Sequence, residues 1–307
     1  MKDFLYDYAR FMRYSSSVGL NTKETLQAFI VKEYHAVEKG MALGNPRPGF
    51  GEVRIASLLN AIEVHESKYG GDPVLDIAFA GLQEYSGFNE RNNISNGVTE
   101  RIKSKLLHYK QESVSVGGTR EISKSEITEA LDFDFGKFIK SRFSIRDFSE
   151  QPVNTADLLA AIDLAKYAPS ACNRQAWKVY LIEHSNKEFK SKILDIQNGN
   201  KGFREQISAL LVITGKLSSF GDYERNQSFI DGGMFAMSLL LALHSKGLGT
   251  CCLNNSFTAA KNKLFCNIMN ISEDNVPIMF IAVGHLKNNF KVAMSARKTL
   301  DEIVTIR

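Results

Sequence analysis

Apolar positions in the first third of the chain recur at the spacing of α-helices. They fall three or four residues apart after a capping box at residues 21–24, which predicts an amphipathic helix that ends at Gly40. The apolar face of this helix comprises Leu26, Phe29, Ile30, Tyr34 and Val37. Further helices are predicted over residues 53–69, from Pro73 onward, and over residues 99–110.

Two stretches interrupt this helical pattern. Residues 44–51 (GNPRPGFG) predict a loop, because proline cannot continue a helix and glycine permits sharp turns. Residues 112–125 (ESVSVGGTREISKS) are polar and rich in Ser and Gly, which is typical of a linker. We therefore predict a helical N-terminal domain over residues 1–125 and a second domain over residues 126–307.

The pattern beyond the linker is that of an α+β fold. An amphipathic helix is predicted from Asn154 to Lys166, and an almost wholly apolar helix over residues 231–246 is expected to be buried on most sides. Short runs rich in β-branched residues predict three buried strands, over residues 178–183, 209–214 and 276–283.

Charge and hydropathy exclude two classes of partner. The net charge is +4 over 307 residues, and no dense run of Lys and Arg offers a footprint for nucleic acid. The longest apolar stretch, residues 234–243, is about half the length that a bilayer span needs. The N-terminal residues lack the apolar core of a signal peptide. We expect a soluble, cytoplasmic protein that binds neither nucleic acid nor a membrane.

The cysteines predict neither a metal site nor a disulfide framework. The four are Cys172, Cys251, Cys252 and Cys266, and no C-x-x-C spacing occurs. Adjacent cysteines rarely bridge, so reduced thiols are expected. The pair Cys251-Cys252 could exchange electrons with a redox cofactor, although packing of small residues in a tight loop is the simpler interpretation.

A first candidate binding segment is Ser141–Phe148 (SRFSIRDF). In an extended chain Arg142, Ser144 and Arg146 project to one side, because side chains alternate along a strand. Two guanidinium groups and a hydroxyl placed together can grip a phosphate. The alternative is a solvated basic edge, which is common on exposed strands.

A second candidate segment is Tyr167–Trp177 (YAPSACNRQAW). Small residues around a proline let the backbone approach a ligand, and Ser170, Asn173 and Gln175 supply polar groups suited to a heterocycle. The alternative is a helix end that turns into a strand, with Asn and Ser satisfying backbone groups.

Together these segments resemble the nitroreductase family. In that family an R-x-S-x-R-like element binds the phosphate of a flavin, and a P-S-x-x-N-x-Q-P-W-like element lies against the flavin across a dimer interface. This chain reads P-S-A-C-N-R-Q-A-W, with Ala176 where proline is usual. Residues 247–255 (GLGTCCLNN) are similar to a family loop that borders the flavin ring, and Ser295–Lys298 (SARK) is similar to a second basic element. The resemblance runs from about Phe138 to the end of the printed sequence.

The resemblance implies a nitroreductase-like fold with a mixed central sheet flanked by helices, bound FMN, and NAD(P)H as electron donor. It implies ping-pong hydride transfer to an electron-poor small-molecule acceptor such as a nitroaromatic or a quinone. It also implies a homodimer with the flavin site at its interface. No side chain is assigned as a catalytic acid or base. The implied FMN-binding residues are Arg142, Ser144, Arg146, Pro169, Ser170, Ala171, Asn173, Gln175, Leu253, Asn254, Arg297 and Lys298. Two alternatives stay open: a flavin-dependent oxidase or dehydrogenase of a biosynthetic intermediate, such as one of polysaccharide synthesis, and a non-catalytic flavin-binding protein.

Two N-terminal features carry further hypotheses. The segment from Glu38 to Gly51 resembles an extension on some nitroreductase-like proteins, occasionally associated with polysaccharide synthesis. Its loop could cover the active site with Arg47 or Phe50, or it could simply pack between domains. The histidines His35 and His65 lie near glutamates, but too few further ligands follow at helical spacing for a metal site.

Overall fold

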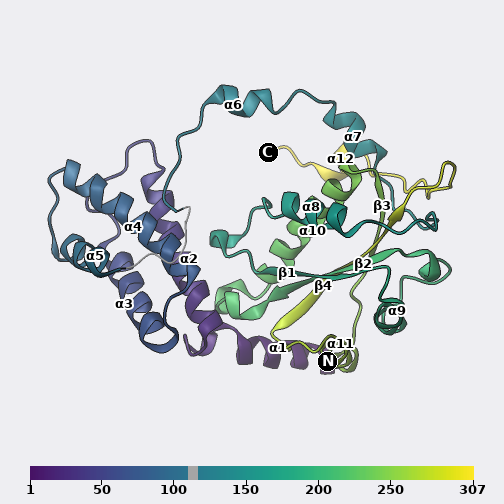
Figure 1. Ribbon diagram of the computed structural model, residues 1–307, viewed down its shortest axis with the longest axis horizontal. Helices are drawn as coiled ribbons and strands as arrows, with labels where there is room; N and C mark the ends of the chain where they lie inside the picture. The colour runs from purple at the N-terminus through teal and green to yellow at the C-terminus, as the bar shows by residue number, and fades with distance from the viewer. Residues whose placement is uncertain (110–116) are drawn as a thin grey trace.

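The computed structural model describes residues 1–109 and 117–307. Figure 1 shows a bundle of helices from the N-terminal part of the chain on one side and a sheet covered by helices on the other. The helices of the N-terminal part are α1 (Lys2–Tyr14), α2 (Lys23–Met41), α3 (Glu52–Tyr69), α4 (Pro73–Arg91) and α5 (Gly97–His108). The mainly helical character predicted for this part is therefore confirmed.

Helices α2 to α5 share one hydrophobic core, because their apolar positions face one another. Side chains in that core that are fully or almost fully buried include Ile30, Ile55, Leu58, Ile62, Leu75 and Tyr85. The predicted cap of α2 is wrong in detail: the capping box pairs Thr22 with Thr25. The helix also continues past Gly40, where a Cβ atom would come within 2.3 Å of the Phe50 ring. Glycine is required there by close packing.

Helix α1 does not belong to this bundle but packs on α11 (Ala259–Met269) of the second half. The Tyr6 hydroxyl donates to Glu273 Oε2 at 2.6 Å, and the Ala259 N–H donates to Asp3 Oδ1 at 2.7 Å. In Figure 1 the start of the chain accordingly lies beside α11, below the sheet. The domain boundary near residue 125 stays a prediction.

The predicted linker over residues 112–125 lies in part outside the described residues. Its described part is held against the bundle, because the Gly118 N–H donates to Glu38 at 3.0 Å and the Thr119 N–H donates to Glu84 at 2.6 Å. Two short helices follow, α6 (Lys124–Glu129) and α7 (Phe135–Ser141). The end of the helix predicted to reach residue 110 also lies outside the described residues.

A four-stranded sheet forms the centre of the second half. Its strands β1 (Trp177–Ile182), β2 (Ala209–Lys216), β3 (Leu248–Leu253) and β4 (Asn275–His285) have the order β1-β2-β4-β3, and neighbouring strands are antiparallel. One isolated bridge, between Ser144 and Thr250, is parallel. The three predicted strands are confirmed. The fourth, β3, was predicted as a loop, because its glycine and two adjacent cysteines conceal the alternation of a strand.

Helices cover both faces of this sheet, as predicted. The residues of β2 alternate between the two faces: Ala209, Leu211 and Ile213 pack with α8 (Thr155–Ala165) and α10 (Gln227–Ser245). Leu210 and Val212 pack on the opposite face with α9 (Lys187–Ile196) and α11. By length and composition α10 could cross a membrane, but half of its apolar window is buried and it contacts all four strands of the sheet. It is the core helix of this half.

Candidate functional site

The basic segment at residues 142–148 lies along the outer edge of β3. The Ile145 N–H donates to the Thr250 carbonyl at 2.8 Å, and Ser144 bridges to the same residue. Ile145 turns into the core, and Arg142, Ser144 and Arg146, which project to the opposite side of the extended chain, line a pocket there. The structure therefore brings these three predicted residues together.

Two glycines make room for Phe148, which anchors this segment to the sheet. Gly249 on β3 and Gly284 on β4 face each other in register, and Phe148 lies over them with no exposed surface. A Cβ atom at Gly284 would come within 2.7 Å of the Phe148 ring, and one at Gly249 within 3.2 Å. The paired glycines thus allow the phenylalanine to dock flat on the sheet, which fixes the arginines two and six residues earlier in the chain.

The second basic element meets the first at this edge. A small cavity of about 100 Å³ is lined by Arg142, Phe143, Ser144, Arg146, Ala293, Ser295 and Arg297. A larger cavity of about 520 Å³ shares Arg142, Phe143, Ser295 and Arg297 and adds the side chains of Ile139, Lys140, Met237 and Met294. Two segments about 150 residues apart in the chain therefore converge on one site. Lys298, predicted beside Arg297, lines neither cavity.

The three arginines of this site lack acidic partners. Within residues 1–109 and 117–307, Arg142, Arg146 and Arg297 form no ion pair with a carboxylate. The one acidic residue of the segment, Asp147, is paired with Lys287. An uncompensated group of guanidiniums around a small pocket is a favourable site for an anion with several oxygens.

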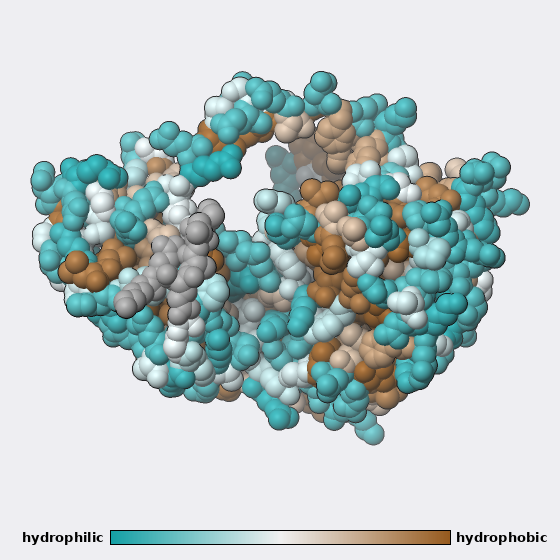
Figure 2. All heavy atoms as spheres, viewed as in Figure 1, coloured by the Kyte–Doolittle hydropathy of each residue, from teal (hydrophilic) through white to brown (hydrophobic). Residues whose placement is uncertain are grey.

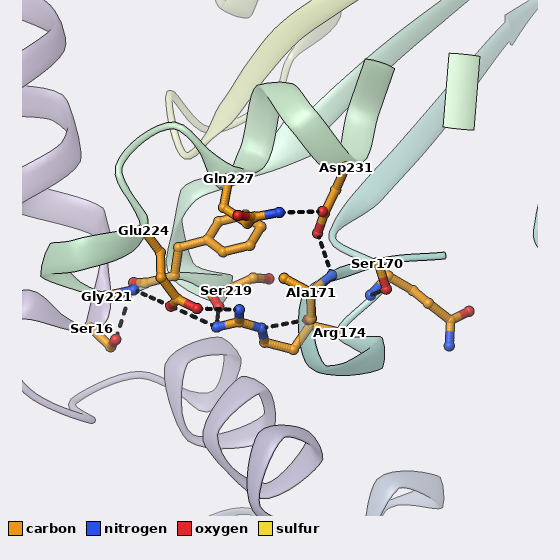
Figure 3. Close-up of polar contacts among 11 residues, drawn as sticks. Ser16, Ser170, Ala171, Arg174, Ser219, Gly221, Glu224, Gln227 and Asp231 are labelled. Atoms are coloured by element: carbon orange, nitrogen blue, oxygen red, sulfur yellow. Dashed lines mark hydrogen bonds and ion pairs between the residues drawn. The ribbon is translucent and has the colours of Figure 1, made fainter. Parts of the chain in front are cut away.

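The second candidate segment forms a tight loop, drawn in Figure 3, that begins after α8 and leads into β1. Cys172, Asn173 and Gln175 have left-handed backbone conformations, with φ angles of 52°, 54° and 46°. Each such residue costs on the order of 1–2 kcal/mol, so the loop must be held in place by its surroundings. The Ser170 hydroxyl accepts a bond from the Gln175 N–H at 3.1 Å.

Two further anchors come from other elements. The Ala171 N–H donates to Asp231 Oδ2 on α10 at 3.0 Å, and Gln227 in turn donates to Asp231 at 2.7 Å. Arg174 forms a bidentate ion pair with Glu224, with N–O distances of 2.8 and 2.5 Å. These contacts appear as dashed lines in Figure 3. None of Asp231, Arg174 and Glu224 was predicted as part of the site.

The ion pair makes the stability of the protein sensitive to acid. The hydrogen bond from Arg174 lowers the pKa of Glu224 in the folded protein, against a smaller opposing effect of burial. Its stabilising contribution is therefore complete above the unfolded value, roughly 4.3, and is lost as the pH falls through the lowered folded value. We expect the free energy of unfolding of the wild type to exceed that of Glu224→Gln at pH 7, with the difference shrinking towards pH 3. Urea denaturation of both proteins at the two pH values measures this, and a difference that grows in acid would contradict it.

The loop and the start of the basic segment contact α10 near its opposite ends. The loop is bonded to Asp231 near the start of the helix, whereas Ser141, next to the basic segment, lies 2.8 Å from His244 near its end. Thirteen residues of helix separate these points, which is about 20 Å along the axis. No residue from 169 to 175 lines either cavity. The structure of one chain therefore does not bring the two predicted segments into one site.

Comparison with known proteins decides the family. The model of the nitroreductase family matches residues 139–210 and 196–285, two overlapping stretches that contain the sheet and the whole of both candidate segments. The second half of this chain belongs to the nitroreductase family. A curated relative that carries the name NAD(P)H nitroreductase, YodC of Bacillus subtilis (strain 168), is 27% identical over 181 residues, covering 48% of this chain and 86% of its own.

Other relatives agree with this assignment. Spy0809 of Streptococcus pyogenes serotype M6, which also carries the name NAD(P)H nitroreductase, is 24% identical over 200 residues, covering 55% of this chain and 96% of its own. The crystal structure of ydfN from Bacillus subtilis, assigned as a nitroreductase, matches with a TM-score of 0.51 at 20% identity, covering 56% of this chain and 98% of its own. The nitroreductase-like fold is thereby confirmed for the second half, and the N-terminal helices lie outside the family match.

Leu253 and Asn254, at the end of β3, line neither cavity. The Leu253 side chain is buried in the core, and the Asn254 carbonyl accepts a bond from Gln197 Nε2 at 3.0 Å. Burial raises the pKa of both Cys251 and Cys252, although nearby arginines oppose this in part. Thiols that resist ionisation are poor nucleophiles, which favours the packing interpretation of this pair.

The loop at residues 44–51 packs within the helical bundle. Phe50 fills the space above Gly40 and meets Tyr85 edge to face at 5.2 Å, while the Tyr85 hydroxyl donates to the Phe50 carbonyl at 2.7 Å. Neither Arg47 nor Phe50 lines the basic pocket, so the structure does not support a lid. His35 bonds to Glu38 at 3.0 Å, and no cluster of metal ligands occurs in the described part of the chain.

The sequence interpretation missed the apolar wall of the larger cavity. Ile139, Phe143, Met237 and Met294 come from α7, the basic segment, α10 and the C-terminal segment. No motif marks them, because any apolar residue of suitable size would serve. Phe143 could have been found, since it lies between Arg142 and Ser144 and stays 40% exposed.

Proposed function

We propose that this chain is an FMN-dependent NAD(P)H oxidoreductase that passes hydride to an electron-poor small molecule by a ping-pong mechanism. One observation carries the proposal: three arginines without acidic partners and Ser144 line a small pocket, which shares four lining residues with a larger cavity that has an apolar wall. The names of the relatives YodC and Spy0809 support NAD(P)H as the electron donor.

The residues present fit FMN. A phosphate monoester carries close to two negative charges at neutral pH, and two or three guanidiniums can neutralise it while forming bidentate hydrogen bonds. We assign phosphate binding to Arg142, Arg146 and Arg297, with a hydrogen bond from Ser144. The neighbouring wall of Phe143, Met237 and Met294 is suited to the apolar part of the same ligand.

Bound FMN supplies the centre that accepts and returns hydride, so both substrates use one site in turn. The chain contributes binding and orientation. Neither Asp, Glu nor His lines the two cavities, so no general acid or base is assigned there. The loop at residues 169–175 would present the polar groups of Ser170, Asn173 and Gln175 to the edge of the ring system.

The proposed enzyme is a homodimer whose flavin sites lie at the subunit interface. The loop at residues 169–175 contacts α10 about 20 Å along its axis from the point where Ser141, at the start of the basic segment, contacts it, so we assign the loop to the site of the second copy. An exposed apolar surface supports this arrangement, and Figure 2 shows apolar residues gathered over α8 and α10. Exposed members include Leu159, Leu164, Phe229, Ile230 and Met237. Such a patch is typical of a protein interface, and we place the dimer in the cytoplasm.

The test is whether the purified protein binds FMN and turns over. We expect a yellow protein with one FMN per chain that oxidises NADPH or NADH under nitrogen when a nitroaromatic or quinone is added, with parallel lines in double-reciprocal plots. Light scattering should give twice the chain mass. A colourless protein that takes up no added FMN would overturn the proposal. Turnover that requires oxygen, with no use of NAD(P)H, would favour a flavin oxidase.

A further inference from the structure

The loop at residues 170–175 is under more backbone strain than any other described segment. Six non-glycine residues in the described parts of the chain have positive φ angles, and three of them, Cys172, Asn173 and Gln175, lie in this loop. Left-handed residues return to more extended conformations unless contacts hold them. A loop of this kind keeps a single shape only when its surroundings specify it.

Arg174, a residue of the loop itself, makes most of the contacts that hold the loop in this conformation. Its side chain is only 3% exposed. Its guanidinium donates to the Ala171 carbonyl at 3.0 Å, to the Ser219 carbonyl at 2.8 Å, and twice to the Glu224 carboxylate. The group also lies over the Phe220 ring, 4.8 Å from its centroid. Four hydrogen bonds, drawn as dashed lines in Figure 3, and a ring contact therefore fix the conformation of this side chain.

The partners of Arg174 are themselves held by the N-terminal segment. Both the N–H and the hydroxyl of Ser16 donate to the Phe220 carbonyl, at 2.9 and 3.0 Å. Helix α2 packs against the turn at Ala171–Asn173 and against the short helix Leu217–Ser219. The loop is therefore enclosed between α10 on one side and the N-terminal helices on the other.

We propose that Arg174 is a positioning residue for the flavin site, which holds Ser170 and Asn173 in the conformation that receives the ring system. The proposal rests on the proposed function and extends it to a residue that binds no ligand itself. It also gives the N-terminal helices a role, because α2 packs against this loop and helps to hold its conformation.

The test measures FMN affinity in matched variants of the full chain. Arg174→Met keeps an unbranched apolar stem but removes the guanidinium and its charge, and Arg174→Lys keeps the charge without the planar guanidinium. Arg204→Met is the control, since Arg204 is also ion-paired, with Asp195 at 2.8 Å, but lies away from the loop. Titration of the apo proteins with FMN gives the Kd, and visible circular dichroism reports the surroundings of the bound flavin.

We expect Arg174→Met to raise the Kd for FMN by about 10-fold, which corresponds to a loop that occupies its binding conformation about a tenth of the time. Arg174→Lys should fall between this variant and the wild type, and Arg204→Met should match the wild type. The visible circular dichroism of bound FMN should change in Arg174→Met alone. If Arg174→Met does not fold, Glu224→Gln should show the same direction with a smaller change.

Two results would overturn the inference, and they are distinguishable. Wild-type affinity and an unchanged flavin spectrum in a folded Arg174→Met protein with a lower melting temperature would show that the ion pair serves stability alone. A wild-type protein that fails to bind FMN would remove the proposed function itself, and this inference with it.

Discussion

Replacement of both Arg142 and Arg146 by alanine is expected to give a folded protein that has lost its FMN. Each hydrogen-bonded contact between a guanidinium and a phosphate contributes about 1.5–3 kcal/mol, so removing two should raise the Kd by roughly 100- to 10,000-fold. Arg146 is exposed and Arg142 half-buried, and neither belongs to the hydrophobic core, so the fold should survive. The flavin absorbance of the purified protein and titration of the apo protein measure the effect.

The control for this prediction removes the same charge elsewhere. Arg101 and Arg120 lie outside the nitroreductase half, with partners Glu63 and Glu126 at the surface of the chain. A protein with both replaced by alanine should keep full FMN occupancy, because exposed ion pairs contribute little and net charge alone does not hold the cofactor. Equal loss of FMN from the two double variants would refute the role of the basic pocket.

Phe148→Ala is expected to cause the largest loss of stability of any single change considered. The ring is completely buried between the paired glycines Gly249 and Gly284 and the core behind them. Truncating a buried phenylalanine costs about 3–5 kcal/mol, through lost burial and the cavity that remains. Urea or thermal denaturation should show this loss, and Phe4→Ala, whose side chain is 79% exposed, should leave stability almost unchanged.

The same substitution should also weaken FMN binding. Phe148 holds the end of the segment that carries Arg142, Ser144 and Arg146, so its loss frees those residues from the edge of the sheet. At a temperature where Phe148→Ala is still folded, the Kd for FMN should exceed that of the wild type. Wild-type affinity there would mean that the segment is held by its bonds to Thr250 alone.

Regular periodicity made most of the fold predictable. Helices with a clear apolar face, such as α2 and α3, and strands with β-branched runs, such as β2 and β4, were located from the sequence. Strand β3 was missed because a glycine, Gly249, occupies the position that faces Phe148, and only the three-dimensional packing explains it. Helix α1 was not located, and its packing on α11 depends on contacts such as Tyr6 with Glu273, 267 residues apart.

The candidate site, like the fold, could be predicted from the sequence only in part. Alternation along an extended segment was enough to place Arg142, Ser144 and Arg146 on one side, and the structure gathers them with Arg297 around one pocket. Lys298 was expected there and lies outside it, because one residue along an irregular segment changes direction. The role of Arg174 could not be inferred, since the sequence does not show that Glu224 and Phe220 lie beside it.

The central claim is that the arginine pocket holds a flavin by its phosphate, and comparing FMN with riboflavin, which lacks that phosphate, tests it most directly. The wild type should bind FMN at least about 100-fold more tightly than riboflavin, as the loss of two charge-assisted contacts implies. In the Arg142→Ala, Arg146→Ala double variant the two ligands should bind almost equally, with riboflavin affinity close to that of the wild type. A preference for FMN that survives in the double variant, or a wild type that does not distinguish the two ligands, would contradict the account.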